Sequence, residues 1–246
     1  MRGGPRPMGI LQRSSNLVHL LAERGPLSTA DAAEQIGMPR PSLYRLSDAL
    51  TQARLIEPTA DGRLRASLHW LRLADAARRG MTEWSGARMV LDDLASSTGQ
   101  TVYLTVPHAD QAVCIDWSRG RGVSVLALKP GRTLPLYAGA AGRVTLAFRP
   151  EPFEEYLQRA PFPAFTEHTL TGASELRTDV ASTRNRGYSV SDEDVTPGIG
   201  ALGVPLNGGG TFRGALSLAG LAEDLRTERE KFIAALLSSA ARLIAG

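Results

Sequence analysis

Residues 28–66, STADAAEQIGMPRPSLYRLSDALTQARLIEPTADGRLRA, decide the fold of the first third of the chain. Ser28 and Asp31 have the spacing of a helix-capping pair, and Gly37 stands where a glycine ends a helix, so a short helix is predicted over residues 29–36. After a four-residue turn, the next predicted helix places apolar side chains at the intervals of one helical face. These side chains are Leu43, Leu46, Leu50 and Ala53.

The segments on either side complete a motif. Residues 14–24 predict an amphipathic helix, which Gly25 and Pro26 end. Residues 55–57 and 64–66 are strand candidates around a turn with Asp61 and Gly62 at its tip. Three short helices followed by a small hairpin predict a winged helix-turn-helix domain over residues 10–70, preceded by a flexible tail over residues 1–9.

The rest of the sequence predicts a domain of mixed helices and strands. A linker helix is expected over residues 71–80, and an α+β domain with a largely antiparallel sheet over residues 81–246. Helices are predicted over residues 82–97, 139–148, 151–159 and 175–186, and strands over residues 101–106, 112–116, 123–127, 201–206 and 212–218. Thr227 and Glu230 have the spacing of a capping box and predict the start of the last helix.

Composition narrows the class of protein. The chain has 246 residues, of which 43% are hydrophobic, enough for one large or two small packed domains. The single cysteine, Cys114, excludes a disulfide framework and a cysteine-rich zinc site. No apolar run approaches the roughly 20 residues of a membrane span, and the N-terminus has no apolar segment of the secretory kind. We therefore expect a soluble cytoplasmic protein without a membrane partner.

Charge is unevenly distributed along the chain. Residues 1–80 contain 12 arginines and 7 acidic residues, a net charge of +5, whereas residues 81–246 carry a net charge of −2. A basic module joined to a mildly acidic one suggests that the first module binds a polyanion.

The polar side of the third predicted helix carries candidate DNA-binding residues. An α-helix fits the major groove, which is about 12 Å wide, and side chains near its N-terminus reach base edges and phosphates. The candidates are Arg40, Ser42, Tyr44 and Arg45 on this helix, and Arg63 and Arg65 in the hairpin. The hairpin arginines are placed to reach the adjacent minor groove or phosphates. The alternative is a three-helix packing unit with a solvated basic face.

Several segments resemble one protein family. Residues 37–46, GMPRPSLYRL, resemble the recognition helix of IclR-type transcriptional regulators. The resemblance continues through residues 55–57, 62–65, 91–104 (LDDLASSTGQTVYL) and 131–138 (GRTLPLYA), and resumes at residues 186–194 and 198–205. It covers about residues 14–230 in the order and spacing of the family, and it implies a sequence-specific DNA-binding regulator.

The resemblance also implies a GAF-like C-terminal domain that binds a small effector on one face of its sheet. The pocket residues that it implies are Ala140, Ala141, Ile199, Ala201, Ser217 and Ala219. Backbone N–H groups at the helix start near Ala140 would suit a carboxylate, so the expected effector is an organic acid or an aromatic molecule. The alternative for these small and apolar residues is an ordinary core.

The sequence departs from the family at several positions. Pro41 replaces the usual serine, Tyr44 replaces a frequent histidine, and Leu202-Gly203 replaces the usual Ile-Ala. These differences bear on the operator sequence and on the effector, and they leave the fold prediction unchanged.

Assembly and regulation are further implications of the resemblance. Operators of such regulators are usually quasi-palindromic, so a homodimer or a dimer of dimers on double-stranded DNA is expected. An effector changes DNA affinity only if it binds one domain arrangement better than another. The linker helix is the expected lever because both domains attach to it.

Other motifs predict no chemistry. Residues 198–203, GIGALG, match a dinucleotide fingerprint, but that motif lies between a strand and a helix, and here no helix follows. Asp192, Glu193 and Asp194 are expected to form a solvated acidic loop, the four histidines lack metal-ligand spacing, and Cys114 is expected to be a buried thiol. We expect no catalytic residue, no metal site and no cofactor.

Besides the regulator described above, two other functions stay open. The first is a DNA-binding scaffold whose second domain only mediates assembly, without a ligand. The second, a small-molecule enzyme, lacks a nucleophile–base pair in the sequence.

Overall fold

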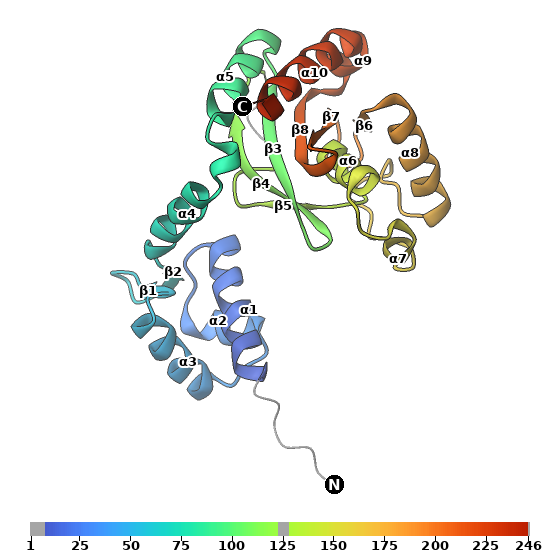
Figure 1. Cartoon of the computed structure of the whole chain (residues 1–246). Helices are drawn as coiled ribbons and strands as arrows, with labels where there is room; N and C mark the ends of the chain where they lie inside the picture. The colour runs from blue at the N-terminus through green and yellow to red at the C-terminus, as the bar shows by residue number, and fades with distance from the viewer. Residues whose placement is uncertain (1–7, 123–127, 246) are drawn as a thin grey trace. The chain divides into compact units, whose positions relative to one another are not determined.

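The computed structural model describes residues 8–122 and 128–245, which divide into two compact units, Met1–Met81 and Thr82–Gly246 (Figure 1). The fold class agrees with the prediction: a helical unit with a small hairpin, then an α+β unit with an antiparallel sheet. No described helix has the length and hydropathy that crossing a membrane requires.

Within its described residues, the first unit contains four helices and one hairpin. Its elements are α1 (Met8–Arg24), α2 (Thr29–Gln35), α3 (Arg40–Gln52), β1 (Ile56–Pro58), β2 (Leu64–Ala66) and α4 (His69–Gly80). The backbone N–H of Asp31 donates to the Ser28 hydroxyl over 3.1 Å, so the predicted cap of α2 is confirmed. The core of this unit joins α1 to α3 and the hairpin through buried Leu17, Leu21, Leu43 and Ile56.

The start of the first unit differs from the prediction. Helix α1 begins at Met8, well before Ser14, so residues 8 and 9 belong to a helix and not to the expected tail. The Ser14 hydroxyl donates to the carbonyl oxygen of Ile10 over 2.8 Å, so this serine bonds within a helix instead of opening one. The remainder of the predicted tail, residues 1–7, lies outside the described residues.

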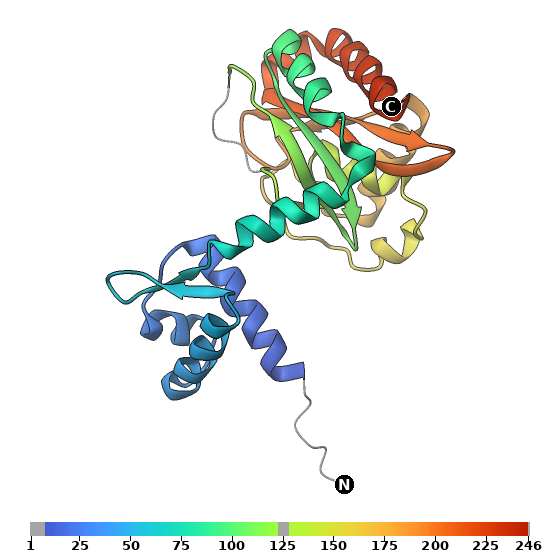
Figure 2. The same ribbon diagram turned by 60° about the vertical axis from the view of Figure 1, so that its left-hand side comes forward.

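The second unit is built on a six-stranded sheet in which all neighbouring strands are antiparallel. The strands are β3 (Thr101–His108), β4 (Gln111–Ser118), β5 (Thr133–Pro135), β6 (Ser189–Asp192), β7 (Ile199–Gly208) and β8 (Thr211–Leu221), in the order β5-β4-β3-β8-β7-β6. Helices α5 (Ala87–Thr98) and α10 (Arg229–Ala245) contact each other and pack on the central strands (Figure 2).

Two further helices of this unit, α6 (Gly139–Phe148) and α8 (Ala173–Arg186), contact each other. Helix α6 also packs on β7 and β8. The smaller ones are η1 (Thr82–Trp84), α7 (Phe153–Leu157) and α9 (Ala222–Thr227). Gly99 and Gly187 end α5 and α8 with φ angles of 73° and 80°, the left-handed conformation that glycine adopts easily after a helix.

Three predictions for this unit need correction. Thr227 does not open the last helix, because Ala222–Thr227 forms its own helix with Glu223 and Asp224 in the favoured first turn, and α10 begins at Arg229. The helix predicted over residues 151–159 spans only Phe153–Leu157. The edge strands β5 and β6 escaped the sequence analysis because they are only three and four residues long. The strand predicted over residues 123–127 lies outside the described residues.

Candidate functional site

Helix α3 separates an apolar side from a basic side. Leu43, Leu46 and Leu50 are buried against the core of the first unit, whereas Arg40, Tyr44 and Arg45 are exposed and Ser42 is half-buried. Within residues 8–122 and 128–245, Arg40 and Arg45 form no ion pair. The exposed guanidinium groups are therefore available to an anionic partner.

The two hairpin arginines have different surroundings. Arg65 donates from Nε and Nη2 to Oε1 of Glu57 over 2.9 and 2.6 Å. The other carboxylate oxygen of Glu57 accepts from the Ser67 hydroxyl over 2.8 Å and from the backbone N–H of Leu68 over 3.2 Å. The hydrogen bonds from Ser67 and then Arg65 hold the pKa of Glu57 below its usual value. Arg65 thus joins the two strands of the hairpin through Glu57, and Glu57 fastens the hairpin to the start of α4.

Arg63 lies closer to the tip of the hairpin and is about half exposed. Its Nε donates to Asp61 over 2.7 Å. Hydrogen bonds from Thr59 and then Arg63 lower the pKa of Asp61. This pair is solvent-exposed, so it is weak and exchangeable, and a phosphate can replace the carboxylate. Arg63 gives up one hydrogen bond to a carboxylate when it changes partners, whereas Arg65 gives up two.

A pocket in the second unit brings together all six of the effector-site residues implied by the resemblance. Its walls come from β3, β5, the start of α6, β6, β7 and β8. The lining residues are Tyr103, Leu128, Leu134, Gly139, Ala140, Ala141, Ser191, Val195, Thr196, Ile199, Ala201, Ser217 and Ala219. None of them carries a charge, and most are apolar, which is typical of a small-molecule pocket.

Strand register places the floor of the pocket. Tyr103 on β3 pairs with Ser217 on β8, and Ser217 pairs in turn with Gly203 on β7. Ala201 pairs with Ala219 in the next row on the same face, since residues two apart in a strand point to the same side. The row with Tyr103 and Ser217 brings two hydroxyl groups to an otherwise apolar surface.

Two glycines let α6 begin directly above this floor. Gly139 has a φ of +70°, and a Cβ there would stand 2.9 Å from a methyl carbon of Leu134. A Cβ on Gly203 would stand 3.1 Å from the carbonyl oxygen of Ala140. The backbone N–H groups of Ala140 and Ala141 lie in the first turn of α6 and have no acceptor within the helix.

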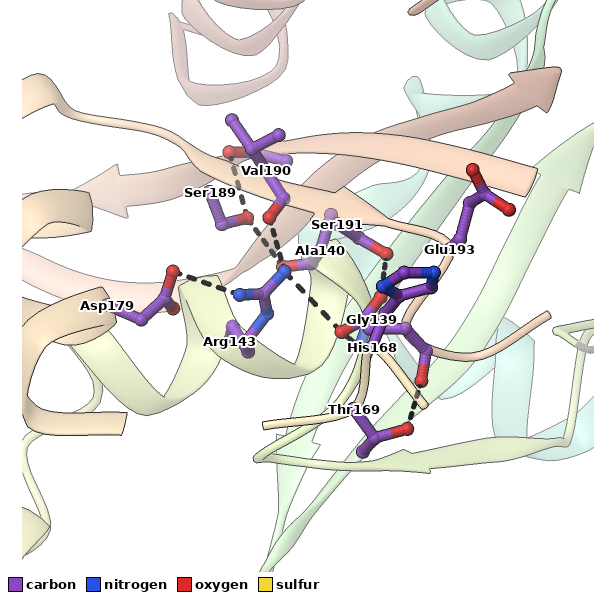
Figure 3. Close-up of polar contacts among 12 residues, drawn as sticks. Gly139, Ala140, Arg143, His168, Thr169, Asp179, Ser189, Val190, Ser191 and Glu193 are labelled. Carbon is purple, nitrogen blue, oxygen red and sulfur yellow. Dashed lines mark hydrogen bonds and ion pairs between the residues drawn. The ribbon is translucent and has the colours of Figure 1, made fainter. Parts of the chain in front are cut away.

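A buried network of charged groups holds the start of α6 in place (Figure 3). Oδ2 of Asp194 accepts from the backbone N–H of Gly139 over 3.0 Å, and Oδ1 accepts from the hydroxyl of Ser191. Arg143 joins Asp194 to Asp179, with nitrogen–oxygen distances of 3.4 and 2.9 Å. Arg186 lies 3.9 Å from Asp179, so two arginines face the two carboxylates and the network orients the pocket without adding a net charge to it.

The position of Asp194 corrects the expectation of a solvated acidic loop. Asp194 is 2% exposed, whereas Asp192 and Glu193 pair with Arg226 on the surface. Glu193 has a φ of +60°, which turns the chain so that its two acidic neighbours point in different directions. The three adjacent carboxylates therefore have two roles: Asp194 belongs to the buried network, whereas Asp192 and Glu193 form ion pairs on the surface.

The sequence analysis missed Tyr103, Leu128, Leu134, Gly139, Ser191, Val195 and Thr196 as lining residues. Tyr103 is 3% exposed, and its hydroxyl has no hydrogen-bond partner among the described residues. Burial, and to a smaller extent Cys114, raise the pKa of Tyr103, so its hydroxyl stays protonated. Tyr103 is identified as a lining residue by the strand pairing that places it beside Ser217. The sequence of β3 alone does not show that pairing.

Other sequence candidates take structural places. Residues 198–203 continue as β7 instead of entering a helix, so they lack the helix N-terminus that a dinucleotide needs. Over the described part of the chain, no three histidine, cysteine or acidic side chains converge as metal ligands would. Cys114 is buried, as expected.

A helix-turn-helix unit with an exposed basic face, followed by a unit with a mostly apolar pocket, is typical of a transcriptional regulator. Residues 11–60 match the IclR helix-turn-helix domain model, and residues 81–245 match the model of the bacterial transcriptional regulator IclR C-terminal domain. The chain belongs to the IclR family of transcriptional regulators, which confirms the resemblance.

Individual relatives are regulators, not enzymes. The glycerol operon regulatory protein of Streptomyces coelicolor is 29% identical over 89% of this chain and 87% of its own. The transcriptional repressor IclR of Escherichia coli is 27% identical over 78% of this chain and 72% of its own. An IclR homologue from Microbacterium hydrocarbonoxydans, crystallised with 4-hydroxybenzoate, has a TM-score of 0.82 at 19% identity over 96% of this chain and 98% of its own.

Proposed function

We propose that this regulator binds a quasi-palindromic operator through α3 and the hairpin, and that a small effector in the pocket of the second unit changes its affinity for that operator. The observation that carries the proposal is the exposed pair Arg40 and Arg45 on α3, which have no acidic partner among the described residues and lie opposite the buried side of the same helix. Such a regulator acts in the cytoplasm, where the DNA is.

The residues of α3 and the hairpin divide the work of DNA binding. Arg40 and Arg45 bind guanine or phosphate, Ser42 binds phosphate, and Tyr44 contacts the backbone or stacks. Arg63 leaves Asp61 for a phosphate in the neighbouring groove. Arg65 keeps the hairpin in place through Glu57, and its contribution to DNA binding is then indirect.

The proposed unit of binding is a homodimer or a dimer of dimers. Helix α4 has no buried side chain, yet it carries exposed Leu71 and Leu73, and α1 exposes Ile10 and Leu11. Exposed apolar side chains on a helix are typical of surfaces that pair with another copy. Two copies related by a two-fold axis present two recognition helices to the two halves of a palindrome.

The proposed effector is an organic acid or an aromatic molecule. The uncharged, mostly apolar lining favours an apolar body, and the first-turn N–H groups of Ala140 and Ala141 favour an oxygen acceptor at one end. The structural neighbour crystallised with 4-hydroxybenzoate is an example of such chemistry in a protein of the same fold. Binding alters DNA affinity to the extent that the effector prefers one arrangement of the protein.

Operator binding is tested by titrating the protein with its own upstream intergenic DNA and with a scrambled duplex, at salt concentrations of about 50 to 200 mM. Tighter binding of the native fragment with a steep salt dependence supports the proposal. Absence of binding to either duplex at low salt contradicts it.

The competing function, a scaffold whose second unit binds no ligand, is tested separately by thermal unfolding with candidate ligands. A ligand at 100 times its Kd adds about 2.7 kcal/mol to the free energy of unfolding. A sensor gains this stability from at least one small acid or aromatic molecule, whereas a scaffold gains it from none.

A further inference from the structure

The hydroxyl of Tyr103 is the polar group in the pocket that most needs a partner. Tyr103 is 3% exposed, lines the pocket, and its Oη atom donates to and accepts from no described residue. A buried hydroxyl without a partner destabilises the folded protein, and each such group in a native structure calls for an explanation. A ligand in the pocket provides that missing partner.

We propose that Tyr103 selects the effector by donating a hydrogen bond to an acceptor oxygen, a carbonyl or carboxylate oxygen, on a small ligand with an apolar body. This inference rests on the proposed effector function and adds to it the residue that recognises the ligand and the group that is recognised.

The geometry favours an acceptor over a donor on the ligand. Three groups around the pocket present hydrogens: the Tyr103 hydroxyl and the first-turn backbone N–H groups of Ala140 and Ala141. Ser217, the cross-strand partner of Tyr103, and Thr196 each add a hydroxyl that either donates or accepts. The Ser191 hydroxyl already donates to Asp194 and so is not free to donate to a ligand.

The apolar body follows from the rest of the lining. Leu128, Leu134, Val195 and Ile199 offer only hydrocarbon to a ligand, and the lining contains no charged side chain. The nearest buried cation, Arg143, is held by Asp179 and Asp194. An acceptor oxygen comes either from an ionised acid, which carries a negative charge, or from a neutral carbonyl compound.

Matched probes separate the two sources. Benzoate and benzamide, and isobutyrate and isobutyramide, form pairs of similar shape that differ in charge, and toluene offers a ring without an acceptor. Calorimetry gives Kd for each probe with the wild type and with Tyr103→Phe. Loss of one hydrogen bond weakens binding about threefold to tenfold for a neutral amide, and about tenfold to hundredfold for a carboxylate. Toluene keeps the same affinity for both proteins.

Tyr137→Phe is the matched control. Tyr137 is also buried in the second unit, but its hydroxyl donates to the carbonyl oxygen of Pro163 over 2.8 Å and it does not line the pocket. We expect the two variants to show opposite behaviour. Tyr137→Phe lowers Tm and keeps probe affinity, whereas Tyr103→Phe keeps or raises Tm and loses probe affinity.

Tryptophan fluorescence shows where the probe binds. The ring of Trp117 stacks on that of Tyr103, with 6.2 Å between centroids, so a ligand beside Tyr103 changes its emission. Trp117→Phe removes this signal and serves as the reference for Trp70 and Trp84.

Each remaining outcome overturns the inference. Equal affinities of the wild type and Tyr103→Phe for an acid or amide exclude the hydrogen bond, and toluene binding as tightly as benzamide excludes an acceptor requirement. A wild type that binds none of the five probes excludes this class of ligand. The operator titration is independent of all three results, so failure of the regulatory function is recognised separately.

Discussion

The two candidate sites handle charge in opposite ways. On α3, Arg40 and Arg45 are exposed and have no acidic partner among the described residues, whereas around the pocket Arg143 and Asp194 are buried and paired, and Arg143 also pairs with the half-buried Asp179. An exposed cation is cheap to keep solvated and ready for a phosphate, while a buried charge must be neutralised inside the protein. One surface attracts a polyanion, and the other fixes the shape of an uncharged cavity.

The strongest test of this difference is Asp194→Ala. The change leaves the Gly139 N–H without its acceptor and removes one of the two carboxylates that pair with Arg143. We expect the free energy of unfolding, measured in urea, to fall by about 3–5 kcal/mol.

Asp192→Ala is the control, because Asp192 pairs with Arg226 in solvent, where an ion pair contributes about 0–1 kcal/mol. Equal effects of the two changes would contradict the assignment of Asp194 to the buried network.

A second test fills the pocket instead of loosening it. Ser217→Leu places extra methylene groups at the floor, which costs a ligand about 1–3 kcal/mol, or roughly fivefold to 150-fold in Kd. We expect the effector response to be lost while operator affinity at fixed salt stays unchanged. A variant that still responds with normal effector affinity places the ligand elsewhere.

A third test addresses the exposed site. Arg45→Ala removes a guanidinium group from the open side of α3 and should weaken specific operator binding by about 1–3 kcal/mol if that group contacts a base. Arg177→Ala, in an exposed pair with Glu154 of the second unit, should leave operator affinity unchanged. Unaltered binding by Arg45→Ala would remove Arg45 from the set of contacts.

The smallest expected effect concerns how pH changes the Glu57 clamp, the set of hydrogen bonds that Glu57 accepts from Arg65, Ser67 and Leu68. Because hydrogen bonds from Ser67 and Arg65 lower the pKa of Glu57 in the folded protein, its stabilisation is complete above the pKa of the unfolded chain. It is lost as the pH falls through the lower, folded value. Glu57→Gln should therefore flatten the fall of Tm in acid without affecting Tm's dependence on pH near neutrality. An identical acid profile in the variant would contradict this clamp.

The first unit was predictable because its signals are local. The Ser28 cap, the Gly37 turn and the leucines of α3 lie within about ten residues of what they organise. The limits of α1 were less accurate, because a glycine at position 9 reads as a loop while the structure places it in the helix.

The pocket was predictable only in part. The resemblance indicated small residues such as Ala140 and Ala201, which the structure brings together, but it did not indicate Tyr103, whose role depends on its pairing with Ser217 114 residues away in the chain. The burial of Asp194 depends on the left-handed backbone conformation of Glu193, which the sequence does not predict. Long-range register and a single backbone angle are the features that patterns of residue types do not encode.

The stability of helix α4 is expected to differ between its two ends. A helix of 12 residues is marginal by itself in water, and α4 buries none of its side chains. Its N-terminal end is fastened, because Trp70 donates to the carbonyl oxygen of Leu55 over 2.7 Å and Glu57 accepts from Leu68. Amide hydrogens of α4 should therefore exchange with solvent slowly near Trp70 and quickly toward Gly80. If another copy or a partner covers the exposed leucines, exchange will be slow along the whole helix.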